Sequence, residues 1–404
     1  MGRSPEGVRL GTGLQEHVRE LTADASGTRD PGGLSLWRRT VAAWQAMRGV
    51  VTDVRAGTVT PPAHRRVRVT DPSHPPRAGV WTRPRTRAIV GGMDDHREAP
   101  ADPAGSPEST HATSAEADEI RRFWGRLGLP GLVDVHTHFM PERVLHKVWG
   151  YFDALGTLTG GLEWPITYRQ EEAERAGILR EFGVRAFTAM LYPHKPGMAR
   201  WLNGWAVDFA ARTPDCLHTA TLYPEPGVEA YVQEAVEAGA RVFKAHVQVG
   251  AYDPADELLQ PAWGLLAEAG IPVVIHCGSG PAPGKHTGPE PIARVLSRHP
   301  RLRLVFAHMG MPEYEEFLDL AERYTQVRLD TTMAFTDFSE KLAPFPPAAL
   351  PRLADLGDRV LLGSDFPNIP YPYLHQLHAL ERLGLGEAWL RAVCHDNAAE
   401  LFGL

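Results

Sequence analysis

Eight short apolar segments, each ending in polar residues, most constrain how this chain can fold. Between them lie longer segments in which apolar residues recur every three or four positions, the pattern of amphipathic helices. This alternation predicts parallel strands, and eight of them close into a (β/α)8 TIM barrel, which we expect to span residues 119–404. The expected strands are 132–138, 186–192, 217–223, 242–247, 272–277, 302–308, 327–332 and 360–365, and the clearest helices are 171–182, 228–238, 260–269, 291–298 and 311–324.

The first expected strand ends in two histidines that share one face. Residues 132–139 read LVDVHTHF, and the two-residue period of a strand points His136 and His138 to the same side. Imidazole nitrogens are good ligands for Zn²⁺ and similar ions. A lone His-x-His pair is equally consistent with two histidines that simply fill polar positions, so its significance depends on the other strands.

Three further strands carry a polar side chain at their C-terminal tips. His276 follows the apolar run 272–275, His308 follows 304–307, and Asp365 ends the segment 361–365. Barrel enzymes place their catalytic groups at this end, and such side chains are costly to bury without partners. The agreement of four strand tips favours a metal-dependent active site over unrelated polar residues.

These segments together resemble the amidohydrolase superfamily. The resemblance rests on residues 133–141 (VDVHTHFMP), on the pairs Ile275-His276 and Ala307-His308, and on residues 363–367 (GSDFP). It covers residues 120–404 in order and points to the amidohydrolase-related (amidohydrolase 2) branch, which includes proteins similar to aminocarboxymuconate semialdehyde decarboxylase. It implies a TIM barrel with a metal site at its mouth.

The resemblance also implies a role for each residue. His136, His138, His276 and Asp365 would bind one divalent metal, with Zn²⁺ expected and Mn²⁺, Fe²⁺ or Co²⁺ as alternatives. Asp365 would also accept a proton from the metal-activated water, and His308 would act as a general acid or base.

The fourth expected strand leaves the number of metals open. Lys244 and His246 share one face by the two-residue period and are candidates to bind the substrate, with Lys244 holding a carboxylate. In some superfamily members a lysine on this strand is carboxylated and bridges two metals, which would make His308 a ligand. Alternatively, Lys244 only pairs with a carboxylate inside the barrel. We expect one metal, and a second remains an open alternative.

Three functions are compatible with these residues. The leading expectation is a metal-dependent hydrolase that acts on a small molecule. The second is a metal-dependent nonoxidative decarboxylase of an unsaturated or aromatic carboxylic acid, because the ligand set is shared. The third is a noncatalytic barrel, which would be expected to have lost tip residues. Dimerisation to a homodimer is common in the resembled branch, and the sequence leaves the oligomeric state of this chain open. An acidic barrel and the lack of a long apolar run predict neither a nucleic-acid nor a membrane partner.

The N-terminal part differs in composition from the barrel. Residues 1–92 contain 15 Arg, no Lys and 7 acidic residues, which leaves a net charge of −15 for the remainder of a chain whose total is −7. We expect residues 1–92 to be disordered or not translated, and residues 93–118 to be an acidic linker. Three scattered cysteines and no recognisable export signal predict a cytoplasmic protein.

Two further acidic residues and one long connection have candidate roles near the barrel mouth. Asp134 could orient a ligand histidine or cap the strand region, and Asp330 could line the pocket. The long connection 140–168 is rich in aromatic residues and is a candidate lid over the barrel mouth.

Overall fold

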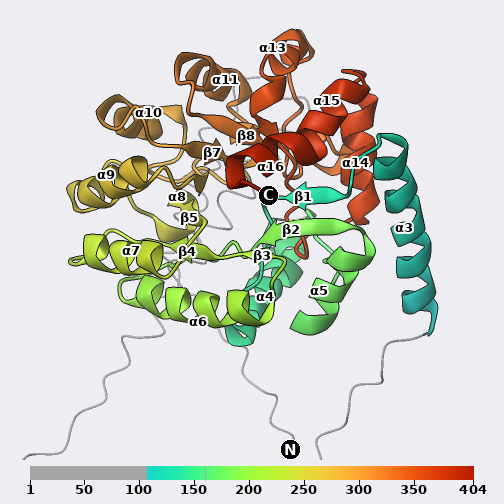
Figure 1. Ribbon diagram of the computed structural model, residues 1–404, viewed down its shortest axis with the longest axis horizontal. Helices are drawn as coiled ribbons and strands as arrows, with labels where there is room; N and C mark the ends of the chain where they lie inside the picture. The colour runs from blue at the N-terminus through green and yellow to red at the C-terminus, as the bar shows by residue number, and fades with distance from the viewer. Residues whose placement is uncertain (1–106, 160) are drawn as a thin grey trace, which may run out of the picture.

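The computed structural model describes residues 107–159 and 161–404, which form a barrel of parallel strands surrounded by helices (Figure 1). Each strand pairs in parallel with its neighbour in chain order, in one sheet of β1-β2-β3 and one of β4 to β9. The strands are β1 (Leu132–Asp134), β2 (Val184–Thr188), β3 (Cys216–Leu217), β4 (Thr219–Thr221), β5 (Val242–His246), β6 (Val273–His276), β7 (Leu304–Phe306), β8 (Arg328–Asp330) and β9 (Val360–Leu361).

Backbone contacts complete the ring between the two sheets. A single residue, His218, separates β3 from β4, so these two short strands together occupy one strand position of the barrel. On the other side, the Val135 amide donates to the Leu362 carbonyl and the Asp365 amide donates to the His136 carbonyl, both at 2.9 Å. The predicted TIM barrel is therefore confirmed, and all eight predicted strands are present, although the regular ladders are shorter than expected.

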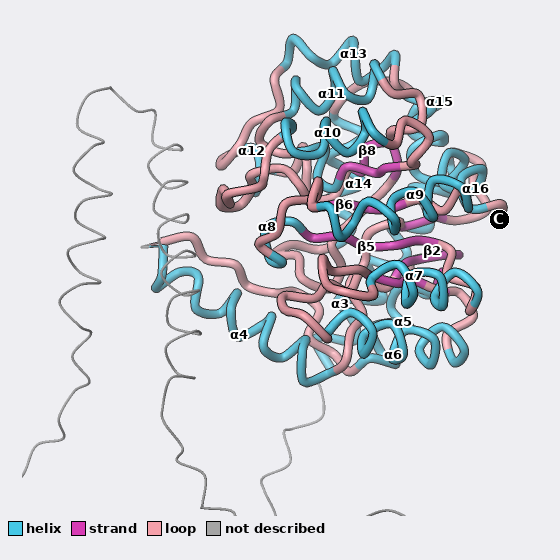
Figure 2. Tube along the Cα trace, turned by 90° about the vertical axis from the view of Figure 1, so that its left-hand side faces the viewer, coloured by secondary structure: helices cyan, strands magenta, loops and turns pink. Residues whose placement is uncertain are grey.

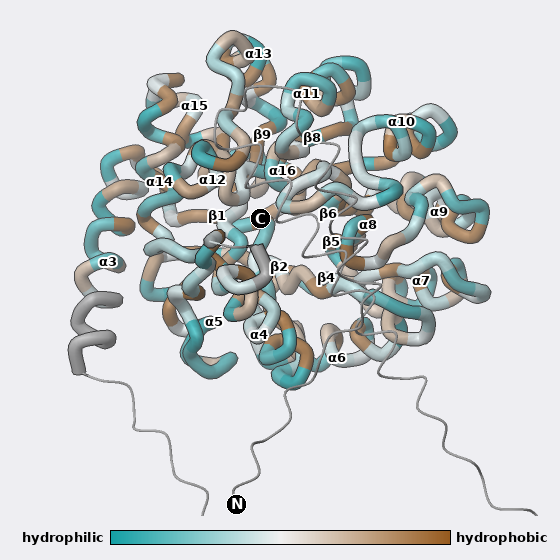
Figure 3. The backbone as a smooth tube through the Cα atoms, turned by 180° about the vertical axis from the view of Figure 1, so that it is seen from behind, coloured by the Kyte–Doolittle hydropathy of each residue, from teal (hydrophilic) through white to brown (hydrophobic). Residues whose placement is uncertain are grey.

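Helices surround this ring and cover its outer face. Figure 3 shows hydrophilic and hydrophobic stretches alternating along the outer helices, as the sequence pattern predicts. The helices are α3 (Pro107–Arg126), α4 (Glu142–Thr159), α5 (Glu172–Glu181), α6 (Met198–Arg212), α7 (Val228–Glu237), α8 (Val247–Gly250), α9 (Gln260–Ala269), α10 (Pro289–Arg298), α11 (Tyr314–Arg323), α12 (Asp337–Glu340), α13 (Leu350–Asp355), α14 (Tyr373–Arg382), α15 (Glu387–Arg391) and α16 (Asn397–Phe402), with short turns η1 (Glu257–Leu259), η2 (Ala307–Gly310), η3 (Pro347–Ala349), η4 (Gly357–Arg359) and η5 (Ala392–Asp396).

The interior of the barrel is closed at one end by α16. Inward side chains of the strands, among them Val133, Val242 and Val305, form one apolar cluster with Ala398 and Phe402 of α16. The opposite end of the barrel carries α4, α8 and α12, on the side away from the C-terminus (Figure 2). A site at the C-terminal ends of the strands is thus open to ligands on one side only.

Two helices lie in segments outside the strands for which no helix was predicted from the sequence. Helix α3 begins at Pro107, inside the segment expected to be a linker, and packs against α14. The connection 140–168, expected as a candidate lid, contains an 18-residue helix, α4, because its apolar residues recur at helical spacing. Residues 1–106 lie outside the described residues, so the expectations for 1–92 and for the first part of the linker are not tested.

None of the helices within residues 107–159 and 161–404 combines the length and the hydropathy of a membrane-spanning helix.

Candidate metal centre

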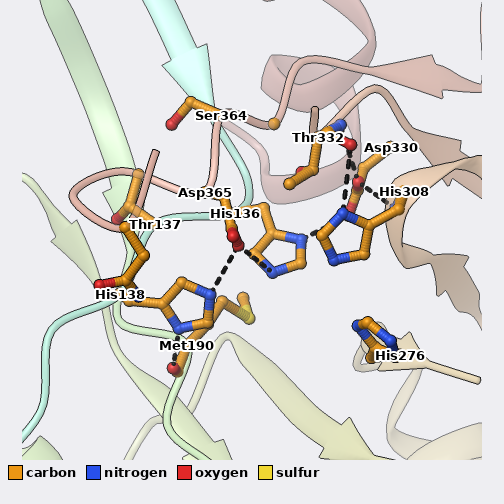
Figure 4. Close-up of polar contacts among 12 residues, drawn as sticks. His136, Thr137, His138, Met190, His276, His308, Asp330, Thr332, Ser364 and Asp365 are labelled. Atoms are coloured by element: carbon orange, nitrogen blue, oxygen red, sulfur yellow. Dashed lines mark hydrogen bonds and ion pairs between the residues drawn. The ribbon is translucent and has the colours of Figure 1, made fainter. Parts of the chain in front are cut away.

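Three buried side chains at the strand ends bring potential metal ligands together. His136 follows β1, His308 follows β7 and Asp365 follows β9, and one donor atom of each lies within 4.8 Å of the others (Figure 4). Neutral imidazoles and a carboxylate are the donors that a catalytic zinc or a similar divalent ion uses. This group contains two of the four predicted ligands, together with the histidine predicted as an acid or base.

Asp330 determines which nitrogen of His136 faces the pocket. Its carboxylate oxygen Oδ2 lies 2.9 Å from His136 Nδ1 and can only accept, so Nδ1 carries the proton. The free Nε2 then faces Asp365 Oδ1 at 3.4 Å. Burial opposes the ionisation of Asp330, but His136 and His308 outweigh it and lower the Asp330 pKa, so the carboxylate stays charged.

His138 also directs a lone pair at Asp365. Its Nδ1 donates to the Met190 carbonyl at 2.7 Å, which leaves Nε2 without a proton in the neutral ring. That Nε2 lies 2.8 Å from Asp365 Oδ1, an acceptor atom. Two lone pairs at this distance repel each other unless a cation or a proton lies between them, so the residues present fit a divalent metal.

The pKa shifts agree with this arrangement. Burial and the neighbouring Lys244 lower the pKa of His136 to about 3, and burial is also the main cause that lowers the pKa of His308. Both rings are therefore neutral near pH 7, which is the form that binds metals. Burial opposes the ionisation of Asp365 as well, but His138, His136 and His308 outweigh it and lower the Asp365 pKa.

Unusual backbone conformations place two of these side chains. His308 has φ 55° and Asp365 has φ 74°, both in the left-handed region that residues with a Cβ rarely adopt. Such conformations persist only where the surrounding contacts hold them, and they cluster at functional sites. Here the His308 amide donates to Asp330 Oδ1 at 2.9 Å, and the Asp365 amide is held by the His136 carbonyl.

Aromatic rings complete the floor of the site. His138, His136, His308, His276, His246 and Tyr192 form a closed series in which each ring contacts the next, with centroid distances from 4.1 to 5.6 Å. His276 and His246 are stacked at 4.1 Å. The Nε2 of His276 faces the Gly280 carbonyl at 2.8 Å, so the structure brings this predicted ligand to the floor but not into the close group of three.

Lys244 lies beneath this floor and is fully buried. Its Nζ is 3.1 Å from His136 Nε2, and burial lowers the pKa of Lys244 to about 8. The lysine therefore lies beside the candidate ligands, as the sequence predicts. His246, the other predicted substrate-binding residue, accepts a hydrogen bond from the Val249 amide at its Nδ1, and its Nε2 therefore carries the ring proton.

Asp134 connects the site to the outer helices. Its carboxylate accepts hydrogen bonds from the Ser364 hydroxyl at 2.6 Å, the Tyr373 hydroxyl at 2.9 Å and the His136 amide at 3.1 Å. Burial raises the pKa of Asp134 to about 7, but three donors directed at it favour the charged form. Asp134 thus holds the backbone of one candidate ligand and the residue before another.

A large pocket opens above the floor. Its volume is about 1200 Å³, and it is lined by the site residues, by α4 and by the start of α6. Sequence reasoning did not place Tyr192 in the site, although it lines the pocket, and it expected Asp330 to line the pocket, whereas Asp330 is the partner of His136 behind it. The two-residue strand period could have indicated Tyr192, because it ends a predicted strand.

The comparisons with known proteins identify the family. The amidohydrolase family model matches residues 133–404, and the chain belongs to this family, whose members include hydrolases and decarboxylases. The family is metal-dependent, which agrees with the donor set described above. A search of curated protein sequences found no significant match.

Several solved structures are similar to this chain at low sequence identity. A TIM-barrel protein of Bordetella bronchiseptica is 20% identical, with a TM-score of 0.48, and the alignment covers 72% of this chain and 92% of that one. The 5-carboxyvanillate decarboxylase LigW of Sphingomonas paucimobilis is 14% identical, with a TM-score of 0.50 and coverages of 68% and 100%. A protein of Pseudomonas putida described as a 2-pyrone-4,6-dicarboxylic acid hydrolase is 18% identical, with a TM-score of 0.46 and coverages of 68% and 98%.

Proposed function

We propose that this chain is a metal-dependent hydrolase that acts on a small molecule at the mouth of the barrel. The observation that carries the proposal is the position of Asp365, whose Oδ1 faces unprotonated nitrogens of His138 at 2.8 Å and of His136 at 3.4 Å. A bound divalent ion supplies Lewis acidity there, which polarises a carbonyl group and makes water a better nucleophile.

We further propose that His136, His138 and Asp365 hold the ion, with His308 or His276 as a further ligand. His308 is the more closely placed of the two. Zinc is the ion we favour, because imidazole and carboxylate donors suit it. Asp365 can hold a proton during the reaction at its second carboxylate oxygen, the one other than Oδ1. Lys244 and the Nε2–H of His246 can bind polar groups of the substrate.

Nonoxidative decarboxylation is the second candidate. Lys244 favours it, because a buried lysine beside the candidate ligands can hold a substrate carboxylate. The two reactions differ in their products. We would incubate the zinc-loaded protein with a panel of lactones, amides and aromatic carboxylic acids and measure acid release and CO₂ in parallel. Hydrolysis predicts a new carboxylate without CO₂; CO₂ release would establish the second candidate instead, and no turnover of any substrate class by metal-loaded protein would contradict both.

A further inference from the structure

The pocket is larger than the chemistry on its floor requires. Pockets for small ligands usually have volumes of roughly 300–1000 Å³, whereas this one has about 1200 Å³. The histidines and Asp365 occupy only its floor, so most of the volume lies between them and the solvent. A substrate that fills the pocket must extend well beyond the group that reacts.

The walls above the floor are apolar and largely aromatic. Trp164 contacts Phe152 and Phe338, with ring centroids 4.9 and 4.7 Å apart. Trp201 of α6 lines the same pocket and is 53% exposed, which is unusual for so large an apolar side chain. The other apolar wall residues include Val148, Tyr151, Met198, Trp205, Met333 and Leu342. These walls suit a flat or extended apolar group.

The exposed rim of the pocket carries an excess of positive charge. Arg143 and Lys147 lie one turn apart on α4, and Lys195 precedes α6; all three are exposed and line the pocket. Within the described part of the chain, none of the three makes an ion pair or a side-chain hydrogen bond. Glu142 is the one acidic lining residue outside the floor, and it lies 3.9 Å from His146. Three cations against one acid leave this rim with a net charge of +2.

Some other surface arginines of the described chain are paired within the protein. Arg169 on the neighbouring loop pairs with Asp153, and Arg200 of α6 pairs with Glu234. The rim cations thus remain available to a ligand, and an apolar wall of low dielectric beside them strengthens their attraction for an anion.

From these features we propose the class of substrate: a molecule with an apolar, aromatic-sized body and an anionic group at the end remote from the metal centre. The body lies between α4 and α6 against Trp164 and Trp201, and the anion is bound at the rim by Arg143, Lys147 and Lys195. This inference rests on the proposed function for the position of the reacting end, but the binding of the anion does not depend on turnover.

Two dyes that share one body test the proposal on the full-length, zinc-loaded protein. 8-Anilinonaphthalene-1-sulfonate carries an anion, and N-phenyl-1-naphthylamine is the same body without it. We would titrate both into wild type, an Arg143→Gln/Lys147→Gln variant, a Lys195→Gln variant and an Arg122→Gln/Arg301→Gln control, in which two exposed cations outside the pocket are neutralised. Metal content of each protein is measured separately.

The proposal predicts that the Arg143/Lys147 variant binds the sulfonate about fivefold to tenfold more weakly, because each exposed charge contributes modestly. Binding of the neutral dye stays within about twofold, and the control variant binds both dyes like wild type. Equal losses for both dyes, or none for the sulfonate, would overturn the proposal. If the metal content of a variant equals that of the wild type, a change in its dye binding cannot result from a damaged metal site.

Competition experiments then distinguish two kinds of anionic group on the substrate, a carboxylate and a phosphate monoester. Displacement of the sulfonate dye by 1-naphthylacetate supports a carboxylate, and displacement by 1-naphthyl phosphate supports a phosphate monoester. If neither competes in the wild type at concentrations that saturate a simple anion site, the proposed substrate class is wrong.

Discussion

His136 Nδ1 lies 2.9 Å from Asp330 Oδ2, and this contact between two buried residues directs the other nitrogen of His136 into the pocket. Partners of this kind fix the tautomer and the orientation of a ligand histidine. Asp330 also accepts the amide of His308 at 2.9 Å, so one carboxylate orients two members of the candidate metal group.

The first prediction concerns this carboxylate. Asp330→Asn keeps the shape of the side chain but removes its charge, and the amide can present a donor to His136. We expect zinc affinity to fall about 10-fold to 100-fold, the usual cost of losing such a partner. Competition with a chromogenic chelator measures it, with the exposed Asp319→Asn as the control. Wild-type affinity in Asp330→Asn would show that Asp330 does not orient the site.

His308 provides a second prediction that separates its two roles. The structure places His308 among the three close donors, so His308→Ala should lower zinc affinity at least tenfold. The same chelator competition measures the change, and catalytic rates are recorded at saturating zinc. A variant that binds zinc like wild type but has lost turnover would instead assign His308 the acid–base role predicted from the sequence.

Gly363 supports a third prediction about close packing. A Cβ at this position would overlap Thr332 Oγ1 and lie 2.9 Å from the Cβ of His136. Gly363→Ala should therefore displace His136, lower the midpoint of thermal unfolding by several degrees and weaken zinc binding. Gly204→Ala in α6 is the matched control, because nothing lies within 4 Å of its added Cβ. A Gly363→Ala protein with unchanged Tm and zinc affinity would contradict the geometry.

The fourth prediction tests whether α3 is part of the barrel domain. Glu116 accepts the Tyr168 hydroxyl at 2.9 Å and the Leu374 amide at 3.0 Å, and Tyr168 in turn accepts the Tyr373 amide at 2.7 Å. Glu116→Ala leaves these donors without an acceptor, so we expect the free energy of unfolding to fall by about 1–3 kcal/mol. Urea unfolding measures it.

The exposed neighbour Glu119 gives the control, since Glu119→Ala should change stability by less than about 0.5 kcal/mol. Equal stabilities of the Glu116 and Glu119 variants would mean that α3 contributes little to the domain.

The strands and the tip residues could be predicted because burial leaves a simple pattern. Apolar runs that end in His276, His308 or Asp365 mark the C-terminal ends of strands, and this signal does not depend on the sequences of the loops that follow. The alternation of these runs with amphipathic segments also predicts the helices around the barrel, and α9 has the predicted bounds.

Other features depend on contacts between distant residues and leave no local pattern. The hydrogen bond between His136 and Asp330 joins residues 194 positions apart, and no periodicity indicates it. The left-handed backbone at His308 and Asp365 runs against local preference, because only tertiary contacts stabilise it. Helix α4 was not predicted: the connection 140–168 was singled out for its aromatic residues as a candidate lid, and Gly150 and Gly156 weaken the helical signal within it.

The most direct test of the central claim is the metal content of the purified protein. Inductively coupled plasma mass spectrometry on wild type and on the His136→Ala/His138→Ala variant measures it per chain. We predict about one zinc or another divalent ion in the wild type and little in the variant, because both histidines direct free nitrogens at Asp365. Near-zero metal in wild type, even after reconstitution with zinc, manganese or iron, would contradict the account.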